Sequence, residues 1–406
     1  MKILVINCDC ITVNSSANLC HLAYIRGLVD SGYAVTLLSA DGKDYVTDKA
    51  MDIPDSVNQV TYYAVSLYEK LSLRKKAISV VSAPVSTTPL SPEINKDSLV
   101  QRIKRMVLSI YGPHTICATF VRKAINFRSK EEYDYVLSIS TPPASHRLAY
   151  ELIKRKHIKC RHWIQIWEDP WYSDAYGFSG KKSIYREEHF LLNCAEKICY
   201  VSPLTLKNQQ RLFPDSADKM YWQPLPFYYQ AEQMLNDKVT NNSYGYFGDY
   251  NPLVRNLEPF YEAAKLTNIT VSICGNPCNR FAPTERIHIH PRLPLDKLRP
   301  IEDSTNVLVF LCNRQGGQIP GKIYQYSATN KTILFIMDGT EDEQKVLWDF
   351  FGKFNRYVCC QNTVEDITRA IRQIESGTLK EISNKPLEEF DPKRTIENIL
   401  RGCDES

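Results

Sequence analysis

Several motifs that would assign a function directly are missing from this chain. No Asp-x-Asp occurs, so the carboxylate pair with which many enzymes hold Mg²⁺ or Mn²⁺ is absent, and we expect no metal site. No Gly-x-Gly-x-x-Gly follows a strand, which excludes the dinucleotide fingerprint. No apolar run approaches the length of a membrane-spanning helix. The 13 cysteines form no Cys-x-x-Cys pair, so we interpret them as buried thiols in a reducing compartment.

The chain is long enough for two cores, and its charge is unevenly spread. At 406 residues it exceeds the size at which a single core stops growing, so we expect two domains. The net charge is +4, yet the segment from Lys70 to Lys130 holds twelve Lys or Arg against two acidic residues, an excess of +10. This excess predicts an anionic partner. Lys2 and a strand follow Met1 at once, so we expect no export signal.

Within the basic segment the sequence predicts a loop and then an amphipathic helix. Residues 82–92 are rich in Pro, Ser and Thr, which is typical of loops. Between 99 and 110 apolar residues recur at helical spacing, while Arg102 and Arg105 fall largely off that face. Such a helix either lies on an anionic membrane surface or is a domain helix with a solvated basic face, and the sequence leaves both open.

Strands and helices alternate along the chain, which predicts an α/β fold with parallel, doubly wound sheets. A proline-rich stretch over 214–229 predicts the crossing between domains. In the first half we expect strands over 2–7, 34–39, 135–139, 163–167 and 198–201, with helices over 19–28 and 183–194. In the second half we expect strands over 244–247, 270–274, 286–289, 307–311, 333–337 and 359–361, with helices over 257–264, 364–374 and 395–400.

A glycine loop in the second half carries the clearest ligand signal. A buried strand ends at Leu311, and a loop with Gly316 and Gly317 leads to a short helix that Pro320 is expected to open. Backbone N–H groups at such a loop and helix start suit a phosphate, and Lys322 adds a positive charge.

A P-loop is a competing interpretation of the same stretch. Gly316 to Lys322 fits Gly-x-x-x-x-Gly-Lys, and the strand over 333–337 ends at Asp338 like a Walker B strand. Ile323, however, occupies the position at which Mg²⁺ coordination needs a Ser or Thr hydroxyl. The P-loop is therefore the weaker interpretation.

Polar residues also follow the strands of the first half. Glu168 and Asp169 come directly after the strand over 163–167, at the sheet edge where such folds bind ligands. Either carboxylate could act as a base, although Asp before Pro is also a common turn starter. We rank both ahead of His21, which we interpret as a helix residue near a turn. The turn before that helix contains Asn14, Ser15 and Ser16.

These stretches together resemble a GT-B fold glycosyltransferase of the glycosyltransferase-4-like kind, as found in bacterial surface-polysaccharide assembly. IPGKIYQYSATNKTILFI is similar to that family's donor-site helix and strand, and YFGDYNPLVRNLEPFYEAAK to its phosphate-binding stretch. VSICGNP resembles its strand-to-glycine turn, and SISTPP and EDPW resemble acceptor-domain turns. The resemblance covers most of the chain. It implies two Rossmann-like, doubly wound domains facing a central cleft.

The resemblance also implies domain limits and site residues. It implies an acceptor-binding domain over 1–225 with a basic insertion at about 66–130, a donor-binding domain over 226–380, and a helical tail over 381–406 that packs toward the first domain. The implied diphosphate-binding residues are Arg255, Gly317, Ile319, Gly321 and Lys322. The implied ribose and nucleotide residues are Gln325, Gly275 and Asn276. The implied acceptor-side loop is Asn14, Ser15 and Ser16, and the implied catalytic residues are Asp169 and Glu168.

The chain departs from the family pattern at charged positions. Gln325 replaces a Glu that grips the ribose, and Gly317 replaces the first Glu of the same pair. Asp249 stands where the family has Arg, and Glu168 replaces the Arg before Asp-Pro-Trp. An amide can still donate and accept hydrogen bonds, but these changes weaken the assignment of the donor.

The expected function is transfer of a sugar from a nucleotide-diphosphate sugar to a lipid-linked glycan, in capsule, exopolysaccharide or O-antigen assembly. The enzyme would be cytoplasmic, peripheral on the inner face of the plasma membrane, and independent of metals, cofactors and nucleic acid. Two alternatives remain open from sequence. One is a sugar-nucleotide epimerase of the same fold, against which the basic insertion argues. The other is an inactive protein that binds a nucleotide sugar or glycan.

Overall fold

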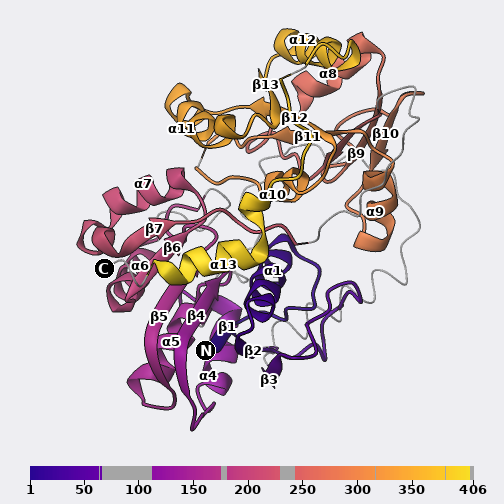
Figure 1. The fold of residues 1–406 in the computed structure, drawn as a ribbon. Helices are drawn as coiled ribbons and strands as arrows, with labels where there is room; N and C mark the ends of the chain where they lie inside the picture. The colour runs from indigo at the N-terminus through magenta and orange to yellow at the C-terminus, as the bar shows by residue number, and fades with distance from the viewer. Residues whose placement is uncertain are drawn as a thin grey trace, which may run out of the picture. The chain divides into compact units, whose positions relative to one another are not determined.

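The computed structural model divides the chain into two compact units (Figure 1). It describes residues 1–63, 65, 112–174, 181–228, 243–315, 317–379 and 381–402. Unit 1 holds Met1–Tyr200, Phe213–Tyr221 and the residues from Gly402, and unit 2 holds Val201–Leu212 and Trp222–Arg401. The predicted loop at 82–92 and the amphipathic helix at 99–110 lie outside the described residues.

Unit 1 is built on a seven-stranded sheet of order β3-β2-β1-β4-β5-β6-β7. The first six strands pair in parallel, with β1 between β2 and β4. Unbroken apolar runs form the central strands because both faces of the sheet are covered. The strands are β1 (Lys2–Asn7), β2 (Ala34–Ala40), β3 (Asn58–Tyr62), β4 (Glu132–Ser140), β5 (Lys159–Trp167), β6 (Lys197–Tyr200) and β7 (Met220–Trp222).

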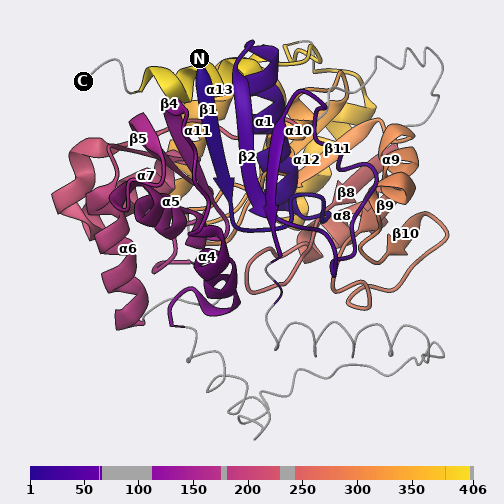
Figure 2. The same ribbon diagram turned by 90° about the horizontal axis from the view of Figure 1, so that it is seen from below.

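Helices cover both faces of this sheet because the crossovers run in opposite directions from β1 and β4. A right-handed crossover to β2 places α1 (Ser16–Asp30) on one face, where it packs against β2 (Figure 2). The crossover from β4 to β5 places α5 (Ala144–Lys154) on the other, beside α4 (Ala118–Ala124). There, apolar residues of both helices pack on Leu4 and Ile6. α6 (Lys182–Cys194) contacts α5.

Unit 2 is built on a six-stranded sheet of order β10-β9-β8-β11-β12-β13, paired in parallel throughout. The strands are β8 (Ser243–Phe247), β9 (Thr270–Cys274), β10 (Ile287–His290), β11 (Val307–Leu311), β12 (Thr332–Met337) and β13 (Tyr357–Gln361). The helices are α7 (Pro203–Leu212), α8 (Glu258–Thr267), α9 (Leu295–Asp303), α10 (Lys322–Ser327), α11 (Glu341–Phe351), α12 (Val364–Glu375) and α13 (Pro392–Arg401).

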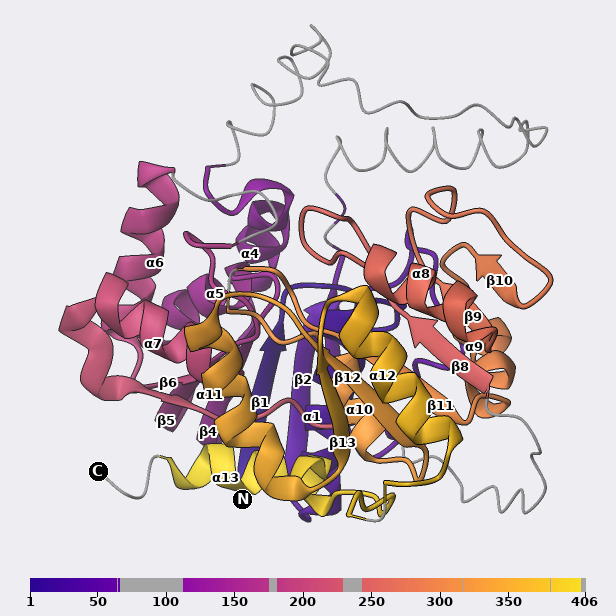
Figure 3. The same ribbon diagram turned by 90° about the horizontal axis from the view of Figure 1, so that it is seen from above.

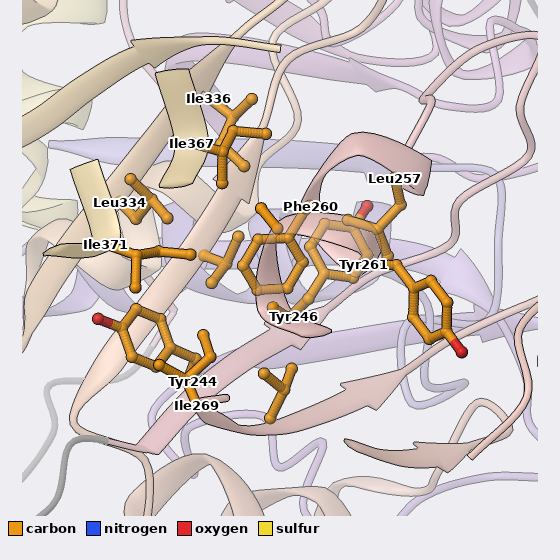
Figure 4. Packing of buried hydrophobic residues seen from close by; sticks show 14 of the residues in the cluster. Tyr244, Tyr246, Leu257, Phe260, Tyr261, Ile269, Leu334, Ile336, Ile367 and Ile371 are labelled. Atoms are coloured by element: carbon orange, nitrogen blue, oxygen red, sulfur yellow. The ribbon is translucent and has the colours of Figure 1, made fainter. Parts of the chain in front are cut away.

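The main core of unit 2 lies between its sheet and the helices α8 and α12. These two helices lie side by side along one face (Figure 3). Phe260 of α8 and Ile367 and Ile371 of α12 pack on strand residues such as Tyr244 and Leu334 (Figure 4). All five side chains are almost fully buried, and each such side chain contributes about 1.5–3 kcal/mol to folding.

The predicted fold class is confirmed as α/β with two doubly wound, Rossmann-like sheets. The strands over 270–274 and 307–311 begin and end at the predicted residues. The helix predicted to open at Pro320 begins at Lys322, and the Pro320 carbonyl accepts a hydrogen bond from the Ile323 N–H in the turn that leads into it. Within the described ranges, no helix combines the length and apolar character needed to cross a bilayer.

Candidate functional site

Each sheet has a point where the strand order reverses, and polar residues gather beside it. In unit 1 the reversal lies between β1 and β4, and in unit 2 between β8 and β11 (Figure 3). Loops that leave neighbouring strands in opposite directions open a crevice at the carboxyl ends of such strands, where doubly wound sheets bind ligands. Each unit therefore has its own candidate ligand edge, at the carboxyl ends of these strands.

The loop after β1 is closed against the start of α1 by side-chain hydrogen bonds. The Asn18 amide donates to the carbonyls of Cys10 and Val13, both at 3.0 Å. The Ser15 hydroxyl accepts from the Asn18 N–H and caps the helix. Asn14 donates to the Asp48 carboxylate at 2.8 Å. Of the predicted acceptor-side residues, Asn14 and Ser15 thus shape this loop, whereas Ser16 is exposed at the first position of α1.

His21 of α1 meets Glu168, which directly follows β5, at this edge of the sheet. The His21 Nε2 atom lies 3.3 Å from the Glu168 carboxylate, and their side chains are 0% and 8% exposed. Asn18 and His21 are three residues apart and share one face of α1. Ser15, by capping α1, and Asn18, by tying the loop to it, therefore fix the helix turn from which His21 reaches Glu168.

Burial and mutual charge set the protonation of this pair. Burial alone would lower the pKa of His21, but the Glu168 carboxylate and then Asp9 outweigh it, so the pKa is raised. Burial raises the pKa of Glu168, and His21 offsets only part of that rise. Burial also raises the pKa of Asp9. The pair is consequently a place where a proton can be held or released beside the sheet edge.

His21 is a helix residue near a turn, as predicted, whereas its pairing with Glu168 is not predicted from the sequence, although the spacing from Asn18 is a usable signal. A polar Asn and His on one face of the first helix, behind a polar turn, point toward the carboxyl edge of β1. Asp169, predicted with Glu168 as catalytic, is exposed next to the pair. The catalytic roles of both carboxylates stay predictions.

In unit 2 the side chain of Arg255 spans the reversal point. Arg255 lies in the loop after β8, and its Nε donates to the Asn313 side chain, just beyond β11, at 2.7 Å. Its Nη1 donates to the Asp249 carbonyl at 3.1 Å. Asn313 is 8% exposed and in turn donates to the Gln318 carbonyl at 3.1 Å. The acceptors of these Arg255 hydrogen bonds are neutral oxygens, so they orient the guanidinium without cancelling its charge.

The ends of β8 and β9 approach each other closely beside this arginine. A side chain at Gly275 would place its Cβ 2.0 Å from the Gly248 carbonyl oxygen, so only glycine fits there. The Asn276 N–H donates to the Asp249 carboxylate at 2.9 Å, and Arg292 pairs with the same carboxylate at 3.2 Å. Gly275 and Asn276, predicted to contact the nucleotide, thus position the β8 loop. The charge of Asp249 is balanced by Arg292.

Two hydroxyl groups hold the Gly317 carbonyl in place. The Gly317 carbonyl accepts hydrogen bonds from Ser202 at 2.7 Å and from Thr205 of α7 at 3.2 Å. Gly317 has a φ of 71°, which glycine adopts without strain. Ile319 is 9% exposed and lines a small pocket together with Gly317 and Asn313. These hydrogen bonds hold Gly317 close to Gln318, whose carbonyl accepts from the Asn313 that orients Arg255.

Lys322, predicted to bind a diphosphate, already has an acidic partner. Its ammonium lies 3.2 Å from the carboxylate of Glu302 in α9, and the two side chains are 25% and 6% exposed. Gly321 caps α10, which is only six residues long. A diphosphate at Lys322 would have to share the ammonium with Glu302. The sequence offered no signal for this partner, because Glu302 lies on a different element.

Gln325, predicted to contact the ribose, is completely buried. Its side-chain carbonyl accepts a hydrogen bond from the Tyr228 N–H at 3.1 Å. A ribose could reach this amide only if the Tyr228 backbone moved away. The ribose role stays a prediction, now with that condition attached.

Metal ligands do not gather in the part of the chain that the structure describes. No group of three or more His, Cys, Asp or Glu side chains within those ranges is placed to hold a metal ion. Positive groups near the second edge include Arg255, Arg292 and Lys322.

The chain matches no family model and no curated protein, but its fold matches solved structures over its whole length. A sucrose-phosphate synthase from Thermosynechococcus elongatus has a TM-score of 0.59 at 11% identity, covering 100% of this chain and 97% of its own. The apo lipopolysaccharide outer core galactosyltransferase WaaB has 0.54 at 11%, covering 100% and 99%. Arabidopsis thaliana UGT89C1 complexed with UDP-L-rhamnose has 0.50 at 11%, covering 99% and 98%. The chain thus has the GT-B fold, as predicted.

Proposed function

We propose that this protein is a glycosyltransferase of the glycosyltransferase-4-like kind, which transfers a sugar from a nucleotide-diphosphate sugar to a glycan acceptor. The observation that carries the proposal is the Arg255–Asn313 hydrogen bond across the reversal point of the second sheet. It fixes a guanidinium where doubly wound sheets bind their ligands. The GT-B fold, which the chain shares with a UDP-sugar complex, supports the same reading.

In this proposal Arg255 stabilises the nucleoside diphosphate as the leaving group. Negative charge develops on the diphosphate as the glycosidic bond breaks, and preoriented donors stabilise it. A guanidinium can donate two parallel hydrogen bonds to phosphate oxygens. Lys322 and the N–H groups around Gly317 and Gly321 complete the positive edge, and no metal is needed.

Glu168 and Asp169 serve the acceptor in this proposal. A carboxylate within hydrogen-bond reach of an acceptor hydroxyl can take up its proton as the sugar is transferred. Glu168 is paired with His21, whose imidazole can share or relay that proton, and the exposed Asp169 lies beside it. Asn14 belongs to the loop at the same edge, and Ser16 is the first residue of α1.

The experiment for the nucleotide site is a thermal-shift screen against UDP, GDP, dTDP, CMP and ATP, with and without Mg²⁺. A nucleotide at 100 times its Kd should stabilise the protein by about 2.7 kcal/mol. We expect one nucleoside diphosphate to stabilise the wild type without Mg²⁺. Arg255→Ala should lose that shift, whereas Arg369→Ala, an exposed arginine of α12, should keep it. Equal shifts in both variants, or no shift with any nucleoside diphosphate, would refute the proposed site.

We further propose a lipid-linked acceptor of bacterial surface-polysaccharide assembly and peripheral attachment to the cytoplasmic face of the membrane. The +10 excess between Lys70 and Lys130 supports this, because each basic residue near an anionic surface contributes about 1 kcal/mol. Co-sedimentation with anionic liposomes should weaken in salt and in an Arg102/Lys104/Arg105→Ala variant, with neutral liposomes as the control. Binding that persists in this variant would contradict the membrane role of this segment.

A further inference from the structure

A buried carboxylate on α6 holds the loop that follows β5. Glu188 is 0% exposed. One of its carboxylate oxygens accepts a hydrogen bond from the Trp171 N–H at 3.3 Å, and the other accepts from the Tyr172 N–H at 2.6 Å. Both oxygens are therefore used on two successive amides of one loop.

Glu188 lies in a buried environment, in which these two hydrogen bonds stabilise its charged form. Burial raises the pKa of Glu188 to about 7, and the two backbone N–H groups offset only part of that effect. Tyr200 of β6 lies nearby, and burial together with the charge of Glu188 raises the pKa of its phenol. Among the described residues, no cation contributes to the pKa of Glu188. The two N–H groups are thus the main compensation for a buried negative charge.

The neighbouring carboxylate on α6, that of Glu187, binds other partners. Glu187 accepts from His114 at 2.9 Å and from Arg147 at 3.0 Å, and its pKa is lowered, since hydrogen bonds and charges of these partners outweigh burial. Among the residues that the structure describes, Glu187 makes no hydrogen bond to the loop after β5. The Trp171 ring contacts the His114 ring instead, at a centroid distance of 5.0 Å. Two adjacent Glu residues of one helix therefore hold different parts of unit 1.

The loop that Glu188 holds also carries the Glu168 carboxylate. Trp171 follows Glu168 by three residues, and Pro170, whose φ is fixed by its ring, lies between them. The loop that follows β5 is thus fixed at one end by the sheet. At Trp171, three residues after Glu168, it is fixed by the hydrogen bond to Glu188. A shift of the Trp171 amide in so short a link would move Glu168 relative to His21.

We propose that Glu188 is a positioning residue, which holds Glu168 and Asp169 in the geometry needed for transfer. This inference rests on the proposed function. Glu188 touches neither substrate, and it acts through the backbone of Trp171 and Tyr172.

The test compares Glu188→Gln with Glu187→Gln. A Gln at position 188 keeps its volume and one acceptor oxygen, but its amide group faces an N–H that it cannot accept from. One of the two loop hydrogen bonds is lost, so we expect amide hydrogen exchange at Trp171 and Tyr172 to quicken at least tenfold without any ligand. Glu187→Gln should leave exchange at these two amides unchanged. Protection of the β4 amides reports whether each variant is folded.

Kinetics supply the second readout. With a sugar donor that carries the nucleotide identified by the thermal-shift screen, Glu188→Gln should lower kcat at least tenfold with the donor KM changed less than twofold. Glu187→Gln should change neither. Unchanged exchange in Glu188→Gln, or quickened exchange with normal kcat, would overturn the positioning role. Should Glu188→Gln fail to fold, Glu188→Asp, which keeps the charge but shortens the reach, is measured in its place with the same expected directions.

The failure of the proposed function is distinguishable from the failure of this inference. A wild type that binds no nucleoside diphosphate and transfers no sugar would refute the function, and with it the kinetic role of Glu188. The exchange measurement needs no substrate and decides independently whether Glu188 holds the loop.

Discussion

The ion pair between Lys322 and Glu302 allows a quantitative prediction about both stability and ligand binding. Lys322→Met removes the cation and leaves Glu302, whose side chain is 6% exposed, without it. Removing one partner of a buried pair costs about 3–5 kcal/mol. The Lys331 ammonium, which donates to the Glu302 backbone carbonyl, still supplies a nearby positive charge. We therefore expect a loss at the lower end of the range, about 3 kcal/mol.

The reverse variant should cost less, because Lys322 keeps access to water. Its side chain is 25% exposed, so after Glu302→Gln the ammonium can be hydrated, and we expect a loss of about 1–2 kcal/mol. In the double variant neither charge is left without its partner. The two losses should therefore not add, and the coupling energy should reach about 1–3 kcal/mol.

Urea unfolding followed by tryptophan fluorescence measures all four proteins of this cycle. Trp222 and Trp348 report on unit 2. A coupling energy under about 0.5 kcal/mol would be within the scatter of independent sites and would refute the electrostatic reasoning.

The same variants test the diphosphate role of Lys322. If Glu302 competes with the ligand for the ammonium, Glu302→Gln should bind the nucleoside diphosphate several-fold more tightly, and Lys322→Met about tenfold more weakly. Titration calorimetry measures both. Equal affinities in the two variants would show that Lys322 only compensates Glu302.

Three further predictions concern pH, a helix cap and metals. Since burial raises the pKa of Glu188 to about 7, the folded state binds a proton there that the unfolded state binds only at lower pH, so this group adds stability as pH falls below about 7. The difference in urea stability between wild type and Glu188→Gln should show this slope, and a pH-independent difference would contradict it. Thr340→Ala, which removes the capping box with Glu343, should cost about 1 kcal/mol in urea unfolding, and Thr340→Ser only a few tenths, whereas equal losses would refute a hydroxyl cap. Addition of EDTA should leave nucleotide affinity and transfer unchanged in calorimetry and rate assays, and a Mg²⁺ requirement would overturn the metal-independent proposal.

Elements that are apolar on both faces could be predicted from the sequence almost to the residue. The strand over 307–311 has this character and was placed without error. Amphipathic elements in polar surroundings were harder to place. The helix α11 was not predicted at all, although Thr340 and Glu343 form a capping box that the spacing Thr-x-x-Glu announces. Its signal was present but lay in a charged stretch without a clear apolar period.

Some residues of the candidate site could likewise be predicted from the sequence, and others could not. Residues of one local stretch, such as Gly317 with Ile319, could be proposed from the sequence because a loop and its strand are contiguous. Pairs that join distant elements could not, because nothing local specifies them. Lys322 with Glu302 and His21 with Glu168 are of this kind. For these, the sequence predicts the sheet edge but not the partner.

The contact between Gly275 and Gly248 has a consequence for finding relatives of this chain. Charged residues can be exchanged in compensating pairs, and an exchange of both Asp249 and Arg292 would keep the charge balance of this edge. A backbone carbonyl 2.0 Å from a would-be Cβ admits no such exchange, since it is the main chain that stands in the way. Between chains as little as 11% identical, a glycine directly after β9 should therefore be retained more often than any charged residue of the candidate site.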